Sequence, residues 1–226
     1  MSAVPCGALL HHLDPISDDA MVLAFLKAEV DSRLYGARVR RLCERRGHDR
    51  RLIDEGDLED REANCLRREI LGDFRGFDRN ALLFANFPPD VAWSRARLSV
   101  RELAHSKYAG WPNWVKLTHG TRLVAEGAKN VANPFYASEE LRIHVPAIEE
   151  ALRAGARFPE LILVGRPDSE ELVLLEGHKR ATAYVRTLEP ADELEIILGS
   201  SEGIDRWRGW RAFLALSLRS DRSRDR

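Results

Sequence analysis

Cysteine is scarce in this sequence, and its positions exclude two ways of stabilising a small protein. The 226 residues contain three cysteines, Cys6, Cys43 and Cys65, which are too few and too scattered for a disulfide framework. None of them forms a Cys-x-x-Cys pair, so a cysteine-type zinc site is not expected either. An apolar core has to stabilise the chain, which is long enough for one large domain or two small ones.

Long hydrophobic runs are also absent. The sequence has no stretch of 18 apolar residues, so we expect no membrane-spanning helix and no membrane partner. The first ten residues lack the positively charged region that begins a signal peptide. These two features predict a soluble protein located in the cytoplasm.

Neither sign of charge is in excess. The sequence has 35 Lys and Arg against 36 Asp and Glu, a formal net charge of −1. This balance argues against a protein whose main role is to coat nucleic acid. Residues 38–51 are a local exception, with seven arginines against Glu44 and Asp49. A solvated helix face is the simpler interpretation of that segment, and a docking patch for phosphate or nucleic acid is the alternative.

The first 90 residues carry helical patterns. Ser17 precedes two aspartates and is a candidate N-cap. Apolar residues then recur at the spacing of one helix face, at Val22, Phe25, Leu26, Val30 and Leu34. Further helices are expected at residues 37–46 and from Arg61 to a stop at Gly72, after a loose lead-in at residues 1–16. We therefore assign residues 1–90 to a helical N-terminal region.

After residue 90 the pattern becomes mixed. Residues 91–100 alternate apolar and polar side chains, which is typical of a half-buried strand, and Ser99 with Glu102 fits a capping box. Helices are expected at residues 123–131 and 139–155, and strands at 161–164, 172–175 and 194–198. This order predicts an α+β fold, with a second domain at residues 91–200. Residues 201–226 are expected to form a C-terminal helix (207–218) and a weakly basic tail.

The most informative stretch is residues 158–185, in which the second of two apolar runs ends at Glu176-Gly177-His178-Lys179-Arg180. A strand that passes through glycine into a helix leaves free N–H groups, and the helix dipole adds partial positive charge there. The glycine lets an anion approach the backbone, and the next three side chains supply donors. The sequence therefore predicts a phosphate site at this turn. A tight turn with solvated charges is the alternative.

A second polar cluster lies at residues 117–122, directly before the helix expected at 123–131. Two hydroxyls, a histidine and an arginine are close together there, at Thr118, His119, Thr121 and Arg122. Such a junction suits a phosphate or a carboxylate, but an ordinary threonine-capped helix start has the same sequence. If the cluster is functional, it would form a second wall of the site predicted at residues 176–180 and bind a phosphate or a carboxylate.

The Gly-x-x-Arg turn at 177–180 and the order of elements around it resemble the ParB/sulfiredoxin superfamily. The resemblance covers residues 91–200 and leaves the N-terminal helical region outside. Members of this superfamily use the turn to bind the phosphates of ATP or CTP. The resemblance therefore implies that the phosphate site here consists of Gly177, His178, Lys179 and Arg180.

The turn also separates the subfamilies. Sulfiredoxin carries a catalytic cysteine directly before a His-Arg pair, whereas His178 stands at that place here, so sulfinic acid reduction is not expected. Chromosome-partitioning ParB proteins have a Gly-Glu-Arg-Arg turn and a downstream helix-turn-helix, and the 26 residues after position 200 are too few for that domain. The free-serine kinases of this fold carry Asp-Gly-His-His-Arg, to which Glu176-Gly-His-Lys-Arg180 comes nearest, with Glu for Asp and Lys for the second His.

The resemblance implies a nucleotide-binding protein, and we expect an ATP-dependent phosphotransferase that acts on a small hydroxyl-bearing substrate with Mg²⁺. Glu176 would hold Mg²⁺ or activate the acceptor hydroxyl, and His178 would donate to a phosphate or move a proton near neutral pH. The alternative is a non-catalytic nucleotide-sensing or DNA-associated module, nuclease-like as some relatives are. Nucleic acid is the less favoured partner, and an oligomer is left open.

Overall fold

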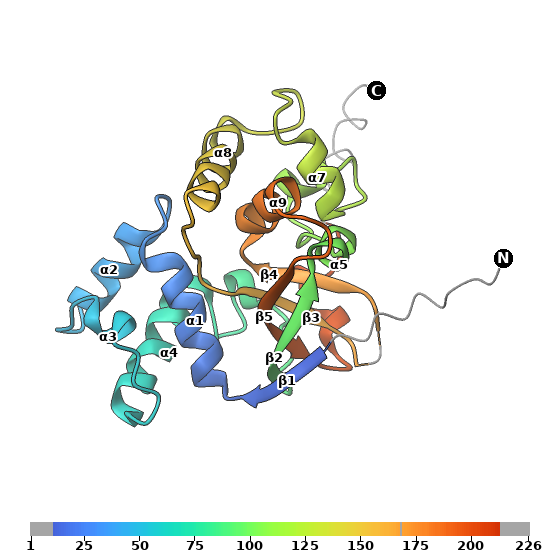
Figure 1. The fold of residues 1–226 in the computed structure, drawn as a ribbon. Coiled ribbons are helices and arrows are strands. Elements are labelled where there is room, and N and C mark those ends of the chain that lie inside the picture. Colours follow the sequence, from blue (N-terminus) through green and yellow to red (C-terminus); the bar gives the residue numbers. More distant parts are fainter. Residues whose placement is uncertain (1–10, 168, 213–226) are drawn as a thin grey trace, which may run out of the picture.

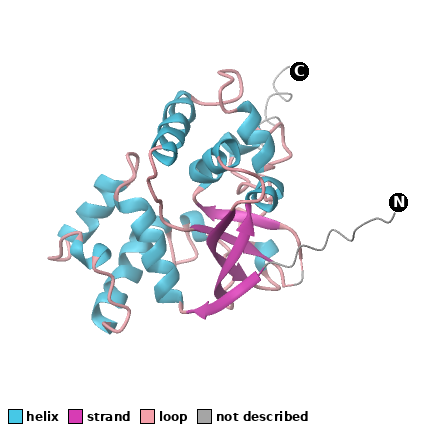
Figure 2. Ribbon diagram, viewed as in Figure 1, coloured by secondary structure: helices cyan, strands magenta, loops and turns pink. Residues whose placement is uncertain are grey.

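The computed structural model describes residues 11–167 and 169–212, which form an α+β fold (Figure 2). The helices of the N-terminal part are α1 (Asp18–Val30), α2 (Gly36–Glu44), α3 (Arg51–Asp54) and α4 (Arg61–Arg75). The remaining helices are α5 (Val100–His105), α6 (Pro112–Leu117), α7 (Val124–Asn130), α8 (Glu139–Arg153) and α9 (His178–Thr187), with 3₁₀ turns at Leu82–Phe84 and Ile204–Arg206. Within the described ranges, no helix combines the length and hydrophobicity that crossing a bilayer requires.

A mixed five-stranded sheet joins the two groups of helices (Figure 1). Its strands are β1 (His11–Ile16), β2 (Ala92–Ser99), β3 (Leu161–Gly165), β4 (Leu172–Glu176) and β5 (Glu193–Ser200), in the spatial order β1-β2-β5-β3-β4. Only β3 and β5 pair in parallel, and the other three neighbouring pairs are antiparallel. The outer edge of β4 is covered by Lys107, whose backbone exchanges hydrogen bonds of 2.8 Å with Leu172 and Leu174.

Short polar side chains set where the helices begin. Ser17 caps α1 by accepting the N–H of Ala20, and Asp60 caps α4 in the same way. Ser99 and Glu102 form the expected capping box at the start of α5, each side chain bonding the other residue's backbone N–H. These hydrogen bonds satisfy N–H groups that have no partner inside the helix.

Three expectations about these elements are wrong. A fourth can be compared with the structure only in part, because some of its residues lie outside the described ranges. Residues 11–16 are strand β1 rather than a loose lead-in, because they pair with β2. Helix α1 ends at Val30, so Leu34 is not on its inner face and is 49 % exposed. Helix α4 runs through Gly72 and ends at Gly76, whose φ of 85° is left-handed. Residues 207–211 form turns and bends, and the rest of the expected helix at 207–218 lies largely outside the described residues.

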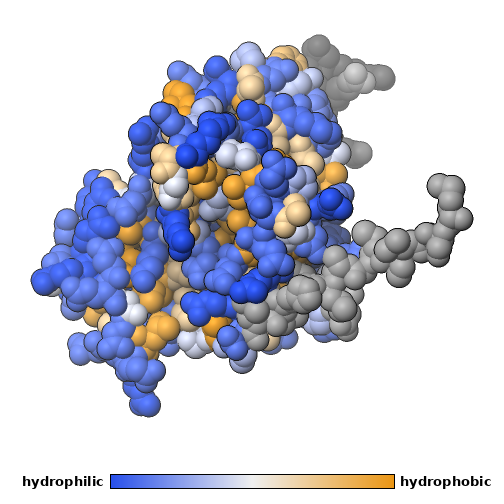
Figure 3. Space-filling view, in the orientation of Figure 1, coloured by the Kyte–Doolittle hydropathy of each residue, from blue (hydrophilic) through white to orange (hydrophobic). Residues whose placement is uncertain are grey.

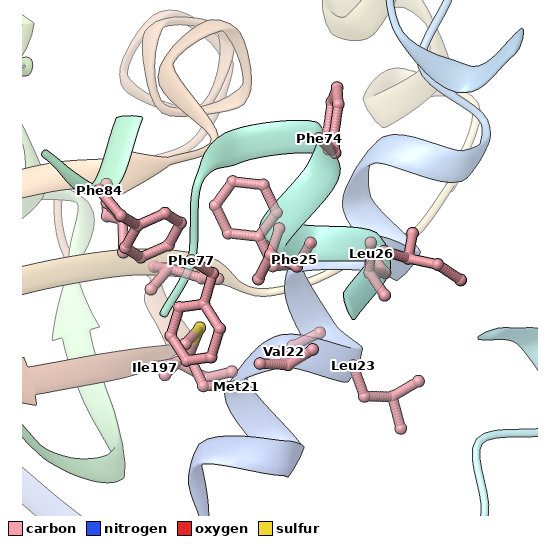
Figure 4. Packing of buried hydrophobic residues seen from close by; sticks show 14 of the residues in the cluster. Met21, Val22, Leu23, Phe25, Leu26, Phe74, Phe77, Phe84 and Ile197 are labelled. Carbon is pink, nitrogen blue, oxygen red and sulfur yellow. The ribbon is translucent and has the colours of Figure 1, made fainter. Parts of the chain in front are cut away.

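Helix α1 is the centre of the largest hydrophobic core (Figure 4). Its residues 21–26 are buried on successive positions, so the helix is enclosed nearly all round and not only along one stripe. Phe25 packs near Phe84 and belongs to the same cluster as Ile197 of β5. The helical N-terminal part and the sheet therefore share one core, and position 90 is not a boundary between two separate cores.

We expect Phe25→Ala to destabilise the fold by about 3–5 kcal/mol, because it leaves a large cavity in this shared core. Leu34→Ala removes a similar apolar side chain from an exposed position and should change the stability by less than about 0.5 kcal/mol. Urea denaturation of both variants measures the difference. A comparable loss in the two variants would contradict the position of α1 in the core.

Candidate functional site

The junction between β4 and α9 has the geometry of an anion site. Gly177 links the two elements with a φ of 97°, a left-handed conformation that favours glycine. A Cβ at this position would also overlap Leu161 Cδ2, which is a second reason for glycine here. Helix α9 begins at His178, and no side chain caps its N-terminus. Its first backbone N–H groups therefore lack the partner that a cap provides, and they carry the positive end of the helix dipole.

This junction lines a cavity of about 640 Å³ between the N-terminal helices and α8. In the space-filling view, hydrophobic residues are visible between the N-terminal helices and the helices above them (Figure 3). The charged lining comprises six cations and four acids, namely Lys27, Arg33, Arg75, Arg157, Lys179 and Arg180 with Glu29, Asp31, Glu140 and Glu176. The lining therefore has a net positive charge, and the aromatic residues Tyr35, Trp111 and Trp114 add flat apolar surface.

His178 is held among aromatic rings. Its ring stacks against Tyr108 with centroids 5.9 Å apart and lies 5.1 Å from the ring of Trp114. Its Nε2 accepts the backbone N–H of Ala109 at 3.3 Å, so the neutral ring carries its proton on Nδ1. Burial, aided by the charges of Arg75, Arg180 and Lys179, lowers its pKa to about 3. His178 is consequently neutral at physiological pH, and this environment does not favour the proton movement expected near neutral pH.

Arg180 bonds to Glu176 and to the backbone. Arg180 Nη2 donates to Glu176 Oε1 at 3.3 Å, and its Nη1 donates to the carbonyl oxygens of Pro159 and, at 3.3 Å, Glu160. The Arg180 residue is only 7 % exposed. Arg180 therefore ties α9 to the chain before β3, and most of its donors are already used within the protein.

Lys179 reaches across the cavity wall to α8. Its Nζ donates to Glu140 and lies 3.2 Å from His144 Nδ1. Partial burial and the charge of Lys179 hold the pKa of His144 below its ordinary value. Lys179 is 26 % exposed at its side chain, so it is the cation of the expected turn that remains most accessible to a ligand.

Glu29 of α1 and Arg75 of α4 form an ion pair at the cavity that was not predicted from the sequence. Glu29 is 4 % exposed and accepts a hydrogen bond from Arg75 Nη2. Burial and the charge of Glu176 raise the pKa of Glu29 to about 7, against the opposing effect of Arg75. One signal was present in the sequence. Glu29 lies four residues after Phe25, which places a carboxylate on the apolar face of α1.

The expected second wall does not lie at this cavity. None of Thr118, His119, Thr121 and Arg122 is among its lining residues. The Thr118 hydroxyl accepts the N–H of Arg122, and the Arg122 guanidinium donates to the carbonyl oxygens of Tyr108 and Gly209. Thr118 and Arg122 are buried, so these contacts hold loops together. The threonine-capped helix start is not found either, because α7 has Leu123 at its N-cap and no capping side chain.

The described carboxylates do not form a ready-made magnesium site. No group of three or more His, Cys, Asp or Glu in the described parts of the chain could hold a metal ion. Glu176, the residue expected to hold Mg²⁺, is bonded to Arg180, and Glu140 is bonded to Lys179. We therefore assign no step to a protein-bound metal.

The arginines of residues 38–51 are largely used within the protein. Arg46 bonds to Glu69 and Asp73, and Arg50 bonds to Asp31 and Asp54. Arg38, Arg40 and Arg51 also donate to oxygens of the chain. Five of the seven arginines thus have internal partners, which supports a solvated helix face more than a docking patch.

No protein-family model, curated protein or solved structure matches this chain. The resemblance to the ParB/sulfiredoxin superfamily therefore stays a prediction from the turn and the element order.

We expect the Glu29 carboxyl to make stability fall as the pH rises. Its pKa is near 7 in the folded protein and about 4.5 when unfolded, so between these values the folded state holds a proton that the unfolded state has lost. The stabilisation is complete below the unfolded value and disappears as the pH passes 7. Relative to Glu29→Gln, the wild type should lose about 1.4 kcal/mol per pH unit in this window.

Urea denaturation of wild type and Glu29→Gln at pH 5, 6, 7 and 8 measures this difference. Glu69→Gln, at a side chain 59 % exposed on α4, is the matched control. A stability difference between wild type and Glu29→Gln that does not change with pH would show that the Glu29 carboxyl is not perturbed.

Proposed function

We propose that the cavity binds a nucleotide with its phosphates at the start of α9. The observation that carries this proposal is the uncapped helix N-terminus at Gly177, which lines a cavity with a net positive charge. Gly177 places no side chain beside the first N–H groups of α9, and Lys179 supplies a partly exposed cation. The cavity volume lies within the range of about 300–1,000 Å³ that small-ligand sites have.

The rest of the lining fits the other parts of a nucleotide. Tyr35, Trp111 and Trp114 line the cavity and are our candidates for contact with a base. His178 is neutral, so it adds no charge of its own and acts as a hydrogen-bond donor through Nδ1. Neutral and cationic donors together suit a ligand with an apolar ring at one end and phosphates at the other.

The reaction that we propose is ATP-dependent phosphoryl transfer to a small hydroxyl-bearing substrate. Such a transfer requires mainly that the phosphoryl group be positioned and its charge stabilised, which the α9 N-terminus and Lys179 would do. Glu176 adjoins Gly177 and is our candidate for accepting the proton of the hydroxyl. Any Mg²⁺ would enter with the nucleotide, since this ion needs only one or two carboxylates besides phosphate oxygens.

A nucleotide sensor without catalysis is the second candidate. The bond between Glu176 and Arg180 favours it, because the two side chains then stabilise the fold and do not contact the ligand. In a sensor the nucleotide would bind without being consumed. The two candidates therefore differ in turnover and not in binding.

We expect ATP or CTP to stabilise the wild type by about 2.7 kcal/mol at 100 times its dissociation constant. A thermal-shift series with ATP, CTP and GTP, each with and without Mg²⁺, measures this effect. Lys179→Gln should reduce the shift, because it removes the accessible cation of the cavity. Lys129→Gln is the control, since Lys129 is also paired with a glutamate but lies outside the cavity.

The absence of a shift with all three nucleotides would rule out the proposed ligand class, and equal shifts in the two lysine variants would place the site elsewhere. Release of ADP that depends on an added hydroxyl acceptor would identify the kinase. Binding without any such release, across a panel of small alcohols and hydroxy amino acids, would favour the sensor.

A further inference from the structure

The guanidinium of Arg75 packs against two aromatic rings at the cavity. Its Cζ lies 4.0 Å from the ring centroid of Tyr35 and 4.3 Å from that of Phe74. These cation–π contacts restrict how the group can turn. A hydrogen-bond acceptor for Arg75 approaches along an edge of the guanidinium, because its N–H groups point outward in the plane of the group.

One edge of this guanidinium is only half used. Nε and Nη2 lie on the same edge, and together they match the two oxygens of a carboxylate or a phosphate. In this structure Nη2 donates to Glu29, whereas Nε is buried and has no hydrogen-bond partner. A buried donor without a partner is costly, so a ligand that bonds both nitrogens would gain more from Arg75 than Glu29 does.

Arg75 also lies within electrostatic reach of the proposed phosphate site. Its charge contributes to the lowered pKa of His178, the first residue of α9. Arg75, Glu29 and the α9 start line the same cavity. A phosphate at the helix N-terminus would therefore be attracted by Arg75, but Glu29 occupies the edge that the phosphate would use.

We propose that Arg75 is an anion-binding residue of this cavity and that Glu29 competes with the ligand for it. A phosphate group of the ligand displaces the Glu29 carboxylate and bonds to Nε and Nη2 together. The inference rests on the proposed function, since it concerns the same cavity and the same class of ligand. It adds that the N-terminal helices supply a binding residue and also an internal inhibitor.

Glu29 can give up its partner more easily than most buried carboxylates. A buried carboxylate that loses its cation is usually left with an uncompensated charge. Burial already favours the neutral form of Glu29, so the carboxyl can stay inside the protein as a neutral group when a ligand replaces it on Arg75. The displacement therefore does not require Glu29 to leave the core.

The pair formed by Arg180 and Glu176 provides a contrast within the same cavity. Arg180 is also held by the carbonyl oxygens of Pro159 and Glu160, so the loss of Glu176 would leave it fixed in place. Within the described residues, Glu29 is the only hydrogen-bond acceptor bonded to Arg75. Removing the charge of Glu29 should thus free a cation for the ligand, whereas removing the charge of Glu176 should not.

The test compares Glu29→Gln with Glu176→Gln in calorimetric titrations with ATP and with inorganic pyrophosphate at pH 8. Glu29→Gln should bind both anions more tightly than the wild type, on the order of tenfold, because the competitor has lost its charge. Glu176→Gln removes one negative charge from the same cavity and should give a much smaller gain. Circular dichroism confirms that each variant is folded.

The gain should also depend on Arg75. In an Arg75→Gln background, Glu29→Gln should no longer change the affinity, since the two side chains act through one contact. If Arg75→Gln does not fold, the comparison of Glu29→Gln with Glu176→Gln decides alone.

Three results would overturn the inference. If the wild type binds ATP and Glu29→Gln binds it equally or less well, Glu29 is not a competitor and the proposed function still stands. If Glu176→Gln increases the affinity as much as Glu29→Gln does, the tighter binding results only from the change in net charge of the cavity. If neither anion binds to the wild type or to any variant, the proposed function fails and this inference fails with it.

Discussion

The burial of α1 is the constraint on which the rest of the structure depends. This helix packs against the other N-terminal helices on one side and the sheet on the other, so its position fixes both. Because its last turn carries Glu29, the same packing brings a carboxylate to the cavity opposite α9. Core and candidate site are thus not separate features, since the residues that stabilise α1 also determine what faces the ligand.

Local features of the fold could be predicted because local interactions produce them. The capping box at Ser99 and the turn at Gly177 each depend on a few neighbouring residues, and both occur where the sequence predicts them. Strand β1 could not be found in this way, because its pairing with β2 joins residues about 80 positions apart. The extent of α1 was overestimated for the opposite reason, since the apolar spacing continues to Leu34 although the helix does not.

The candidate site could be predicted only on one side. The sequence indicates the glycine and the cations of the α9 start, which are contiguous. It does not show that Arg180 bonds to backbone carbonyls, or that Thr118 bonds to the backbone of Arg122 within their own loop. It also could not bring Arg75 to Glu29, a contact between helices 46 residues apart that tertiary packing alone creates. The sequence thus indicates the residues at the start of α9, but it does not indicate Arg75 and Glu29 on the opposite side of the cavity.

The cover on the outer edge of β4 has a consequence for how the molecule behaves in a crowded solution. An open edge strand is a template on which other chains add and aggregate. Lys107 occupies the backbone groups of Leu172 and Leu174, so the strand that leads into Gly177 has neighbours on both sides. At residues 172–174 this edge of β4 is thereby closed to the addition of another strand.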